Sequence, residues 1–218
     1  MSLYGIGDIH GCVNTLDLLL EKIEPGADDH LVFIGDYVDR GPNTKAVIER
    51  LIRLQGECEC TFLRGNHEEM MLDFLDFRES ELWHINGGDA TLASYLAGTG
   101  NYAIPEEHET FVRETVAYWN EPDFFFVHAG LKPHLTIEEN LVHHSSEVFL
   151  WERSHLAAKE LAWEKPVVCG HTPQREPIDR PLLICIDTGC VYTSYPGYGV
   201  LTAVRLPDRE MIQVKFAD

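Results

Sequence analysis

The order of apolar segments in the first third of the chain predicts an α/β fold. Three short apolar runs alternate with two segments whose apolar side chains recur at helical spacing. This β-α-β-α-β order implies a parallel sheet with right-handed crossovers. A chain of 218 residues can fill one core, and no linker-like stretch divides it, so we expect one domain over residues 1–218.

Each element of this unit has its own signal. The expected strands are the apolar runs Leu3–Ile6, Leu31–Ile34 and Thr61–Leu63. Asn14 is the expected N-cap of the first helix, whose apolar residues lie on one face until the Pro-Gly pair at 25–26 ends it. The second helix follows Pro42, and a third starts near His67.

The rest of the chain is predicted to be more mixed. Helices are expected at Ala90–Leu96, Thr110–Trp119 and Ser154–Trp163. Strands are expected at Phe124–Val127, Val167–Cys169, Leu183–Ile186, Gly199–Arg205 and Ile212–Lys215. A hairpin around Pro207-Asp208 joins the last two, so the final third is rich in strands.

Composition bounds the class of protein. The chain is 44% hydrophobic and 24% charged, as globular proteins are. No apolar run approaches the roughly 20 residues of a membrane span, and the chain opens at Met1 directly into a strand-like segment without a secretory signal. The six cysteines form no C-x-x-C pair. We therefore expect a cytoplasmic protein with reduced thiols and no membrane partner.

The formal net charge of −19 excludes one class of partner. A surface this acidic repels the nucleic acid backbone, so no nucleic acid partner is expected. It would also repel phosphorylated substrates at long range, unless bound cations neutralise some of the carboxylates.

Polar side chains follow five of the predicted strands at the point where each strand ends. In chain order they are Asp8 and His10, then Asp36, Asp39 and Arg40, then Asn66 and His67, then His128, and then His171. Because ligands bind beyond the carboxyl ends of the strands in open α/β sheets, we expect these groups to converge on one rim. Any one of these segments alone would be read as a turn; five in order indicate a site.

The chemistry of this set fits two divalent metal ions. Carboxylate, amide and imidazole donors without a thiolate suit manganese, iron or zinc. A shared carboxylate can bridge two ions about 3.5–4 Å apart, which is the spacing of two-metal hydrolases. Asp36, from the middle of the set, is the expected bridge.

The motifs resemble the signature of the PPP phosphoprotein phosphatases. The matching segments are GDIHG, GDYVDRG, GNHE, HAG and GHTP. Further matches resemble the short bacterial and bacteriophage branch: Cys12, Trp83 with Asn86-Gly87-Gly88, Trp151-Glu152-Arg153 and Ile186–Gly189. The matching runs from residue 4 to about residue 205.

The resemblance implies a fold and a set of roles. The fold would be a calcineurin-like metallophosphoesterase β-sandwich flanked by helices (α/β/β/α), with a second, mixed sheet. The first metal would be held by Asp8, His10 and Asp36, and the second by Asp36, Asn66, His128 and His171. His67, hydrogen-bonded to Asp39, resembles the general acid. Arg40 and Arg153 resemble the arginines that bind the phosphoryl oxygens.

The implied activity is metal-dependent hydrolysis of phosphomonoesters by direct attack of a metal-bridging hydroxide. The expected partners are phosphorylated Ser/Thr proteins or peptides, with phosphotyrosine and small phosphoesters as further substrates, and the expected cofactor is a pair of Mn²⁺ ions. A symmetrical dinucleoside tetraphosphate hydrolase is the alternative, which Asp39, Glu68 and the short chain disfavour. The other alternative is an inactive relative that binds phosphopeptides.

Three further features receive structural readings. The pair His143-His144 is read as a solvated loop rather than an additional metal site. Trp83 to Gly88 is either a turn over the site or a helix end. Asp187-Thr188-Gly189 is read as structural.

Overall fold

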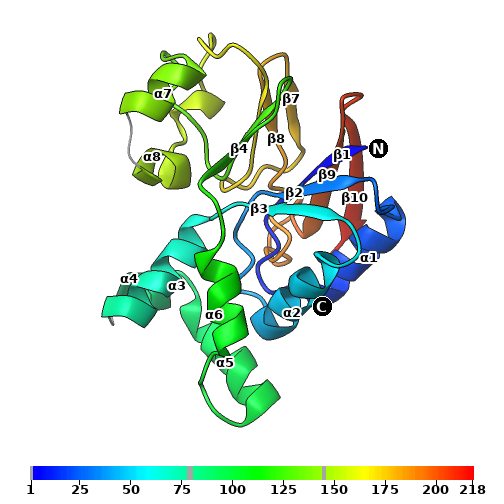
Figure 1. Cartoon of the computed structure of the whole chain (residues 1–218), viewed down its shortest axis with the longest axis vertical. Coiled ribbons are helices and arrows are strands. Elements are labelled where there is room, and N and C mark those ends of the chain that lie inside the picture. The colour runs from blue at the N-terminus through cyan, green and yellow to red at the C-terminus, as the bar shows by residue number, and fades with distance from the viewer. Residues whose placement is uncertain (1, 78–80, 144–145) are drawn as a thin grey trace.

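The computed structural model describes residues 2–77, 81–143 and 146–218, and these form two five-stranded sheets (Figure 1). The first sheet holds, in spatial order, β10 (Glu210–Lys215), β9 (Val200–Leu206), β1 (Leu3–Ile6), β2 (His30–Phe33) and β3 (Glu59–Phe62). The second holds β4 (Tyr118–Asn120), β5 (Phe125–Val127), β6 (Val167–Cys169), β8 (Leu183–Cys185) and β7 (Ile178–Arg180). Both sheets are mixed: β1, β2 and β3 run parallel, as do β5, β6 and β8. The strand β9 pairs antiparallel with β1 and β10, β4 with β5, and β7 with β8.

Helices lie on the outer sides of this pair of sheets, and some of them pack on other helices rather than on a sheet (Figure 1). They are α1 (Val13–Ile23), α2 (Thr44–Leu54), α3 (Asn66–Phe77), α4 (Glu81–Ile85), α5 (Gly88–Thr99), α6 (Glu106–Arg113), α7 (Ile137–His143), α8 (Ser146–Trp151) and a 3₁₀ turn at Ser154–Leu156. Helices α1 and α2 cover the first sheet, and α7 and α8 lie beside the second. None of the described helices is long and apolar enough to cross a membrane.

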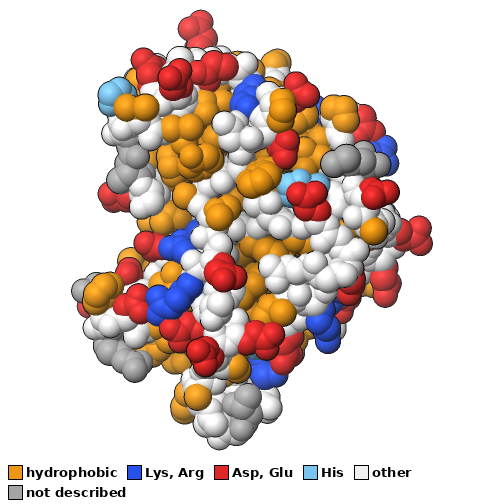
Figure 2. Space-filling model, in the orientation of Figure 1, with side chains coloured by type: hydrophobic (Ala, Val, Ile, Leu, Met, Phe, Trp, Pro, Cys, Tyr) orange, Lys and Arg blue, Asp and Glu red, His pale blue; other side chains and the backbone are white. Residues whose placement is uncertain are grey.

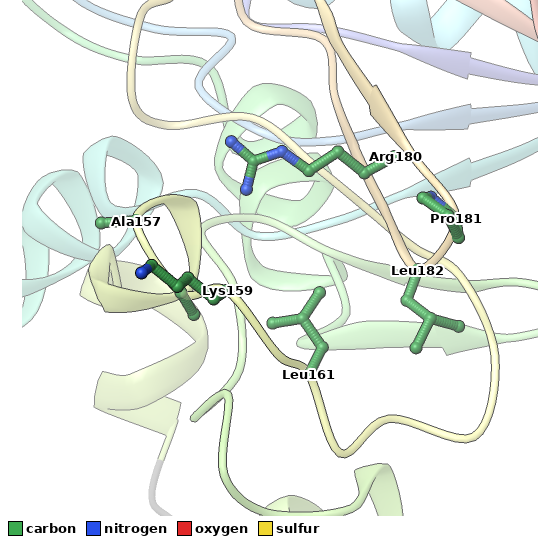
Figure 3. A pocket seen from close by; sticks show the side chains of 7 residues that line it. Ala157, Lys159, Leu161, Arg180, Pro181 and Leu182 are labelled. Atoms are coloured by element: carbon green, nitrogen blue, oxygen red, sulfur yellow. The ribbon is translucent and has the colours of Figure 1, made fainter.

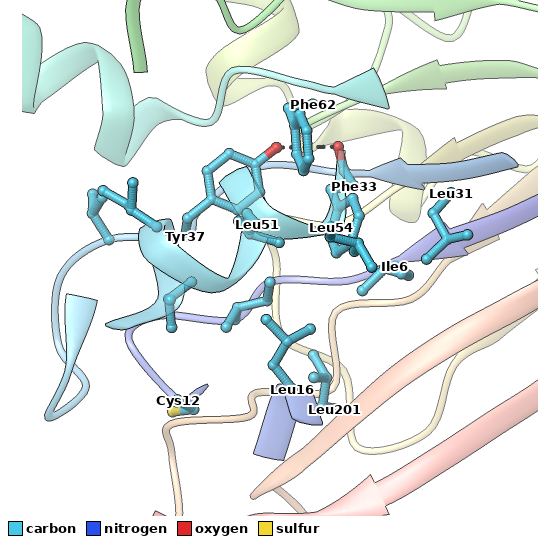
Figure 4. Close-up of a cluster of buried hydrophobic side chains, with 14 of the residues drawn as sticks. Ile6, Cys12, Leu16, Leu31, Phe33, Tyr37, Leu51, Leu54, Phe62 and Leu201 are labelled. Atoms are coloured by element: carbon cyan, nitrogen blue, oxygen red, sulfur yellow. Dashed lines mark hydrogen bonds between the residues drawn. The ribbon is translucent and has the colours of Figure 1, made fainter. Parts of the chain in front are cut away.

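Alternation along the strands produces the layers, because successive side chains of a strand point to opposite faces. Leu31 and Phe33 of β2 pack with α1 and α2 in one cluster (Figure 4). Val32, from the same strand, packs between the sheets against Phe126. Phe125 faces outward, toward the residues of α7 and α8. Three apolar layers thus separate four structural layers, which confirms the predicted α/β/β/α sandwich.

The structure corrects the predicted placement of the late strands. The strand-rich final third does not form one sheet: β6, β7 and β8 join β4 and β5 in the second sheet, and β9 and β10 belong to the first. The predicted hairpin forms and joins β9 to β10, yet β9 pairs antiparallel with β1 and belongs to the first sheet. Sequence order alone cannot assign a strand to a sheet, because both sheets have buried apolar strands.

Two helix predictions were wrong. The helix expected over Thr110–Trp119 ends at Arg113, since Val116 donates its backbone N–H to Phe62 and the chain continues into β4. The helix expected over Ser154–Trp163 is only the 3₁₀ turn. Its apolar residues Leu156, Leu161 and Trp163 pack on the second sheet, at a spacing that no helix face provides.

The predicted cap of α1 was also wrong, because Asn14 lies inside the helix. The carboxylate of Asp218 takes its place and accepts from the backbone N–H groups of Asn14 at 2.9 Å and Thr15 at 3.0 Å. The Thr15 hydroxyl donates to the same carboxylate at 2.7 Å. All six cysteines are free thiols, as expected.

Candidate metal centre

The predicted site residues gather where the ends of the two sheets meet. Asp8 follows β1 of the first sheet, and His171 follows β6 of the second. The Asp8 carboxylate accepts from the backbone N–H of His171, with N···O distances of 3.0 and 3.3 Å. The expectation of a single rim on one sheet is therefore corrected: the site is built by two sheets.

The backbone at this junction is unusual. His10, Asp36, Asp39, Arg40 and His171 adopt φ angles between 48° and 70°. Non-glycine residues rarely occupy this left-handed region, and those that do concentrate at functional sites. The turns that follow the strands are thus held in conformations that aim these side chains inward.

Two clusters of donor atoms share Asp36. One is formed by His10, Asp36 and His67, and the other by Asp36, His128 and His171, and within each cluster the donor atoms lie within 4.8 Å of one another. Asp36 Oδ2 faces His10 Nε2 at 3.5 Å, and Asp36 Oδ1 faces His128 Nε2 at 3.5 Å. One carboxylate oxygen therefore faces each cluster, as a bridging ligand requires.

Asn66 completes the second cluster. Its Oδ1 lies 3.0 Å from His128 Nε2 and 2.8 Å from His171 Nδ1. His128 donates its Nδ1–H to the carbonyl of Ile34 at 3.0 Å, so its Nε2 carries a lone pair. Burial lowers the pKa of His128, which keeps the ring neutral. Two acceptor atoms thus lie 3.0 Å apart, close enough for one cation to bind both.

His10 is held in the same way as His128, with Nδ1 hydrogen-bonded to a backbone carbonyl and Nε2 facing the centre. Its Nδ1–H donates to the carbonyl of Val38 at 2.8 Å, and burial, followed by the nearby Arg40, holds its pKa well below the usual range. Its free Nε2 accepts from Arg40 Nη1 at 2.7 Å. This nitrogen can bind either the guanidinium or a metal ion, but not both.

Buried carboxylates add to the demand for a cation. Burial, followed by Asp187, raises the pKa of Asp8 well above its ordinary value. Burial also raises the pKa of Asp187 to about 7. Asp8 belongs to neither donor cluster, and its carboxylate is turned to the backbone of His171. The residues present fit divalent ions: hard oxygen donors, neutral imidazole rings and buried carboxylates whose charged forms a cation would stabilise.

The predicted phosphate-binding arginines lie on opposite sides of the centre. Arg40 contacts His10, in the first cluster. Arg153 donates from Nε and Nη2 to His171 Nε2 at 3.1 and 2.9 Å, in the second. Arg153 is exposed, and its segment is fixed by the buried Glu152 carboxylate, which accepts from the backbone N–H groups of Arg153 and Ser154.

His67 and Asp39 form the predicted pair. His67 Nδ1 lies 2.6 Å from Asp39 Oδ2, and both side chains are buried. His67 Nε2 lies 4.0 Å from Asp36 Oδ2 and, among the residues that the structure describes, has no hydrogen-bond partner. Burial alone would lower the pKa of His67, but Asp36 and Asp39 more than offset this, so the pKa is raised and the imidazolium is favoured.

Glu68 has a role that the sequence did not reveal. Its buried carboxylate accepts from the backbone N–H groups of Asp36 and Tyr37, both at 2.8 Å, and of Gly65 at 2.9 Å. One side chain therefore ties the Asp36 turn to the Asn66 turn. In the sequence, the only signal for this role was the position of Glu68 directly after Asn66 and His67.

Glu68→Gln is expected to lower the free energy of unfolding by roughly 2–4 kcal/mol, because an amide NH₂ would face backbone N–H donors inside the protein. Urea denaturation of the apo-protein measures this. The matched control is Glu69→Gln, whose carboxylate forms a half-exposed ion pair with Arg64 and should contribute at most about 1 kcal/mol. Equal losses in the two variants would contradict the role given to Glu68.

A separate cavity of about 490 Å³ lies between the segment at 157–161 and the turn from β7 to β8 (Figure 3). Lys159, Arg180 and Leu182 are among its lining residues, and none of the predicted site residues lines it. His143 ends α7, and His144 lies outside the described residues. The prediction that this pair forms a solvated loop therefore gains no structural support.

Comparison with known proteins agrees with this geometry. The asymmetrical bis(5'-nucleosyl)-tetraphosphatase PrpE of Oceanobacillus iheyensis is 28% identical and covers 96% of this chain and 90% of its own length. Serine/threonine-protein phosphatase 1 of Salmonella typhimurium is 30% identical and covers 92% of this chain and 90% of its own length. A crystal structure provisionally named a diadenosine tetraphosphatase superposes with a TM-score of 0.74 at 26% identity, covering 100% of this chain and 94% of that one.

These relatives confirm the PPP-type resemblance of the motifs. The family model for calcineurin-like phosphoesterases matches residues 1–197. That range includes all the residues of both donor clusters. This chain belongs to the calcineurin-like phosphoesterase family, whose members use divalent metal ions to hydrolyse phosphoesters.

Proposed function

We propose that the chain is a two-metal phosphatase of phosphorylated Ser/Thr proteins or peptides, with phosphotyrosine and small phosphoesters as further substrates. The buried His67–Asp39 pair carries this proposal. A serine alkoxide is a poor leaving group unless it is protonated. His67 Nε2 is directed at the centre and has no hydrogen-bond partner within residues 2–77, 81–143 and 146–218. A phosphate leaving group, as in a nucleoside polyphosphate, has far less need of such a donor.

The other residues receive the roles that their positions allow. Arg40 and Arg153, one beside each cluster, bind the phosphoryl oxygens, since a guanidinium can donate to two oxygens at once. Asp39 orients His67 and stabilises its charged form. His67 then transfers its Nε2 proton to the departing oxygen.

The ligand sets remain those expected from the motifs. Asp8, His10 and Asp36 would hold one ion, and Asp36, Asn66, His128 and His171 the other. When bound, two divalent ions supply Lewis acidity that makes hydroxide available near neutral pH and stabilises charge on the phosphoryl group. We propose Mn²⁺ as the native ion, with iron or zinc as alternatives, and a cytoplasmic location.

Hydrolysis of dinucleoside tetraphosphates is the second candidate. Chain length does not separate the two activities, because the match to the tetraphosphatase PrpE covers 90% of that protein. The structure also places aromatic rings beside the centre: Arg40 lies 5.5 Å from the ring centroid of Tyr192, which contacts the exposed Tyr195. Such rings can stack on a nucleobase.

One comparison separates the candidates. We expect kcat/KM of manganese-loaded enzyme to be higher on a phosphoserine peptide than on diadenosine tetraphosphate. The reverse order would replace the proposal with the second candidate. Absence of turnover on both, and on p-nitrophenyl phosphate, would support the inactive phosphopeptide-binding relative instead.

Removal of metal is expected to abolish activity. Chelation followed by dialysis should leave an inactive protein that Mn²⁺ restores, because the donor set contains no alternative nucleophile. Elemental analysis of the dialysed protein is the control. Full activity of verified metal-free protein would exclude the metal-dependent mechanism.

The acidic surface does not form one patch on the face shown in Figure 2. Carboxylate side chains are spread along its edges and over the helices, with apolar side chains between them. The net charge of −19 is therefore distributed rather than focused on this face. Because the negative charge is spread out, the arginines and bound cations can still attract a phosphate group at short range.

A further inference from the structure

The segment from Trp83 to Thr91 contributes no predicted ligand, yet it contacts the catalytic pair. Trp83, on α4, is fully buried, and its indole N–H lies 3.0 and 2.9 Å from the two carboxylate oxygens of Asp39. Thr91, on α5, is also fully buried. Its hydroxyl donates to Asp39 Oδ1 at 2.7 Å and accepts from the Asp39 backbone N–H at 2.9 Å.

These contacts fix the Asp39 carboxylate completely. His67 occupies Oδ2 at 2.6 Å, Thr91 occupies Oδ1, and Trp83 spans both oxygens. The donors come from three different helices, so the carboxylate cannot rotate without breaking a buried hydrogen bond. Its orientation in turn sets the ring of His67 and directs Nε2 toward Asp36.

The same segment also contacts Arg40. The carbonyl of Gly87 accepts from the backbone N–H of Arg40 at 3.2 Å. Gly87 has φ 103°, and a Cβ there would lie 2.9 Å from Arg40 Cγ. The neighbouring Gly88 serves Trp83, because a Cβ on Gly88 would lie 2.5 to 2.8 Å from the indole ring. Gly87 thus allows Arg40 to pack closely against the backbone, and Gly88 allows the Trp83 ring to do so.

We propose that residues 83–91, here called the clamp, position both the proton donor and the phosphate-binding Arg40. Trp83 and Thr91 are positioning residues for His67 through Asp39, and Gly87 is a positioning residue for Arg40. This inference rests on the proposed function. It also gives a role to Trp83, Gly87 and Gly88 of the motif, for which neither the ligand set nor the catalytic pair accounts.

Trp83→Phe tests the part of the clamp that contacts Asp39, because it keeps an aromatic ring at this position and removes the indole N–H. We expect kcat on a phosphoserine peptide to fall by roughly 10–100-fold, the usual cost of losing a supporting hydrogen bond, with a clearly smaller loss on p-nitrophenyl phosphate. The matched control is Trp119→Phe. Trp119 lies on β4, and its indole N–H also donates to a carboxylate, that of Glu121 at 2.7 Å. The ratio of kcat on the phosphoserine peptide to kcat on p-nitrophenyl phosphate should therefore stay unchanged in this variant.

Substitutions of the two glycines test the contacts with Trp83 and with Arg40 separately. Gly88→Ala keeps every polar group but displaces the indole, so it should lower kcat on the phosphoserine peptide selectively. Gly87→Ala should instead raise KM for both substrates, because it disturbs Arg40. If Trp83→Phe does not fold, Thr91→Val removes the other donor to Asp39 and carries the same expectation.

Comparison with His67→Asn separates failure of the clamp from failure of the proposed function. A selective loss in His67→Asn together with equal losses on both substrates in Trp83→Phe and Gly88→Ala would overturn the clamp and leave the proposed function standing. Equal losses on both substrates in His67→Asn itself would overturn the proton donor and the clamp with it. Thermal unfolding and metal content verify that each variant is folded and loaded.

Discussion

His67→Asn is expected to lower kcat on a phosphoserine peptide by roughly 10²–10⁴, the usual range for general acid catalysis. The loss on p-nitrophenyl phosphate should be markedly smaller, because p-nitrophenolate is a weak base that departs without a proton. Steady-state kinetics on the two substrates measure the difference. Asp39→Asn should give the same pattern in milder form, since it removes the carboxylate that orients and stabilises the charged ring but keeps the proton donor itself.

The competing role for His67 is that of a metal ligand, since it shares a donor cluster with His10 and Asp36. In that case the metal content of His67→Asn would fall, and both substrates would lose activity equally. Elemental analysis is therefore the control for this variant. Two retained ions with a selective loss support the proton donor; equal losses, with chemistry rate-limiting for both substrates, rule it out.

Asp36→Asn is expected to reduce activity more than a change at any other predicted ligand. Asp36 is the only residue common to both donor clusters of the described chain, and its two oxygens face His10 and His128. Replacing the carboxylate removes the negative charge between two cations. Fewer than two ions per chain should then remain after dialysis.

His128→Asn is the matched comparison, because this imidazole belongs to one cluster only. It should lose one ion and leave the site of His10 occupied. If Asp36→Asn keeps two tightly bound ions and near-normal turnover, Asp36 is not the bridge. Equal loss of activity in the two variants would likewise contradict the distinction between shared and terminal ligands.

The order of the motifs predicted which side chains come together better than it predicted which strands share a sheet. Each motif follows a strand directly, and a strand end restricts where the next side chains can lie, so Asp36, Asn66 and His128 were placed from their order alone. The second sheet was harder to predict. Its strands β4 and β7 are only three residues long and half exposed, so they carry little hydrophobic signal.

Residues that act through hydrogen bonds to other residues could not be predicted from pattern. Glu68 and Thr91 look like ordinary helix residues, and their partners lie 32 and 52 positions away. No local spacing rule connects such residues. Trp83 was noticed as part of a resemblance, but only the structure relates its indole to Asp39.

The contact between Asp8 and the backbone of His171 has a consequence for how the protein folds. It joins residues 163 positions apart and connects one sheet to the other. The proposed ligands therefore come together only once both sheets have docked, a step that closes a long-range contact. If docking follows the folding transition state, added Mn²⁺ is expected to slow unfolding and leave the refolding rate nearly unchanged.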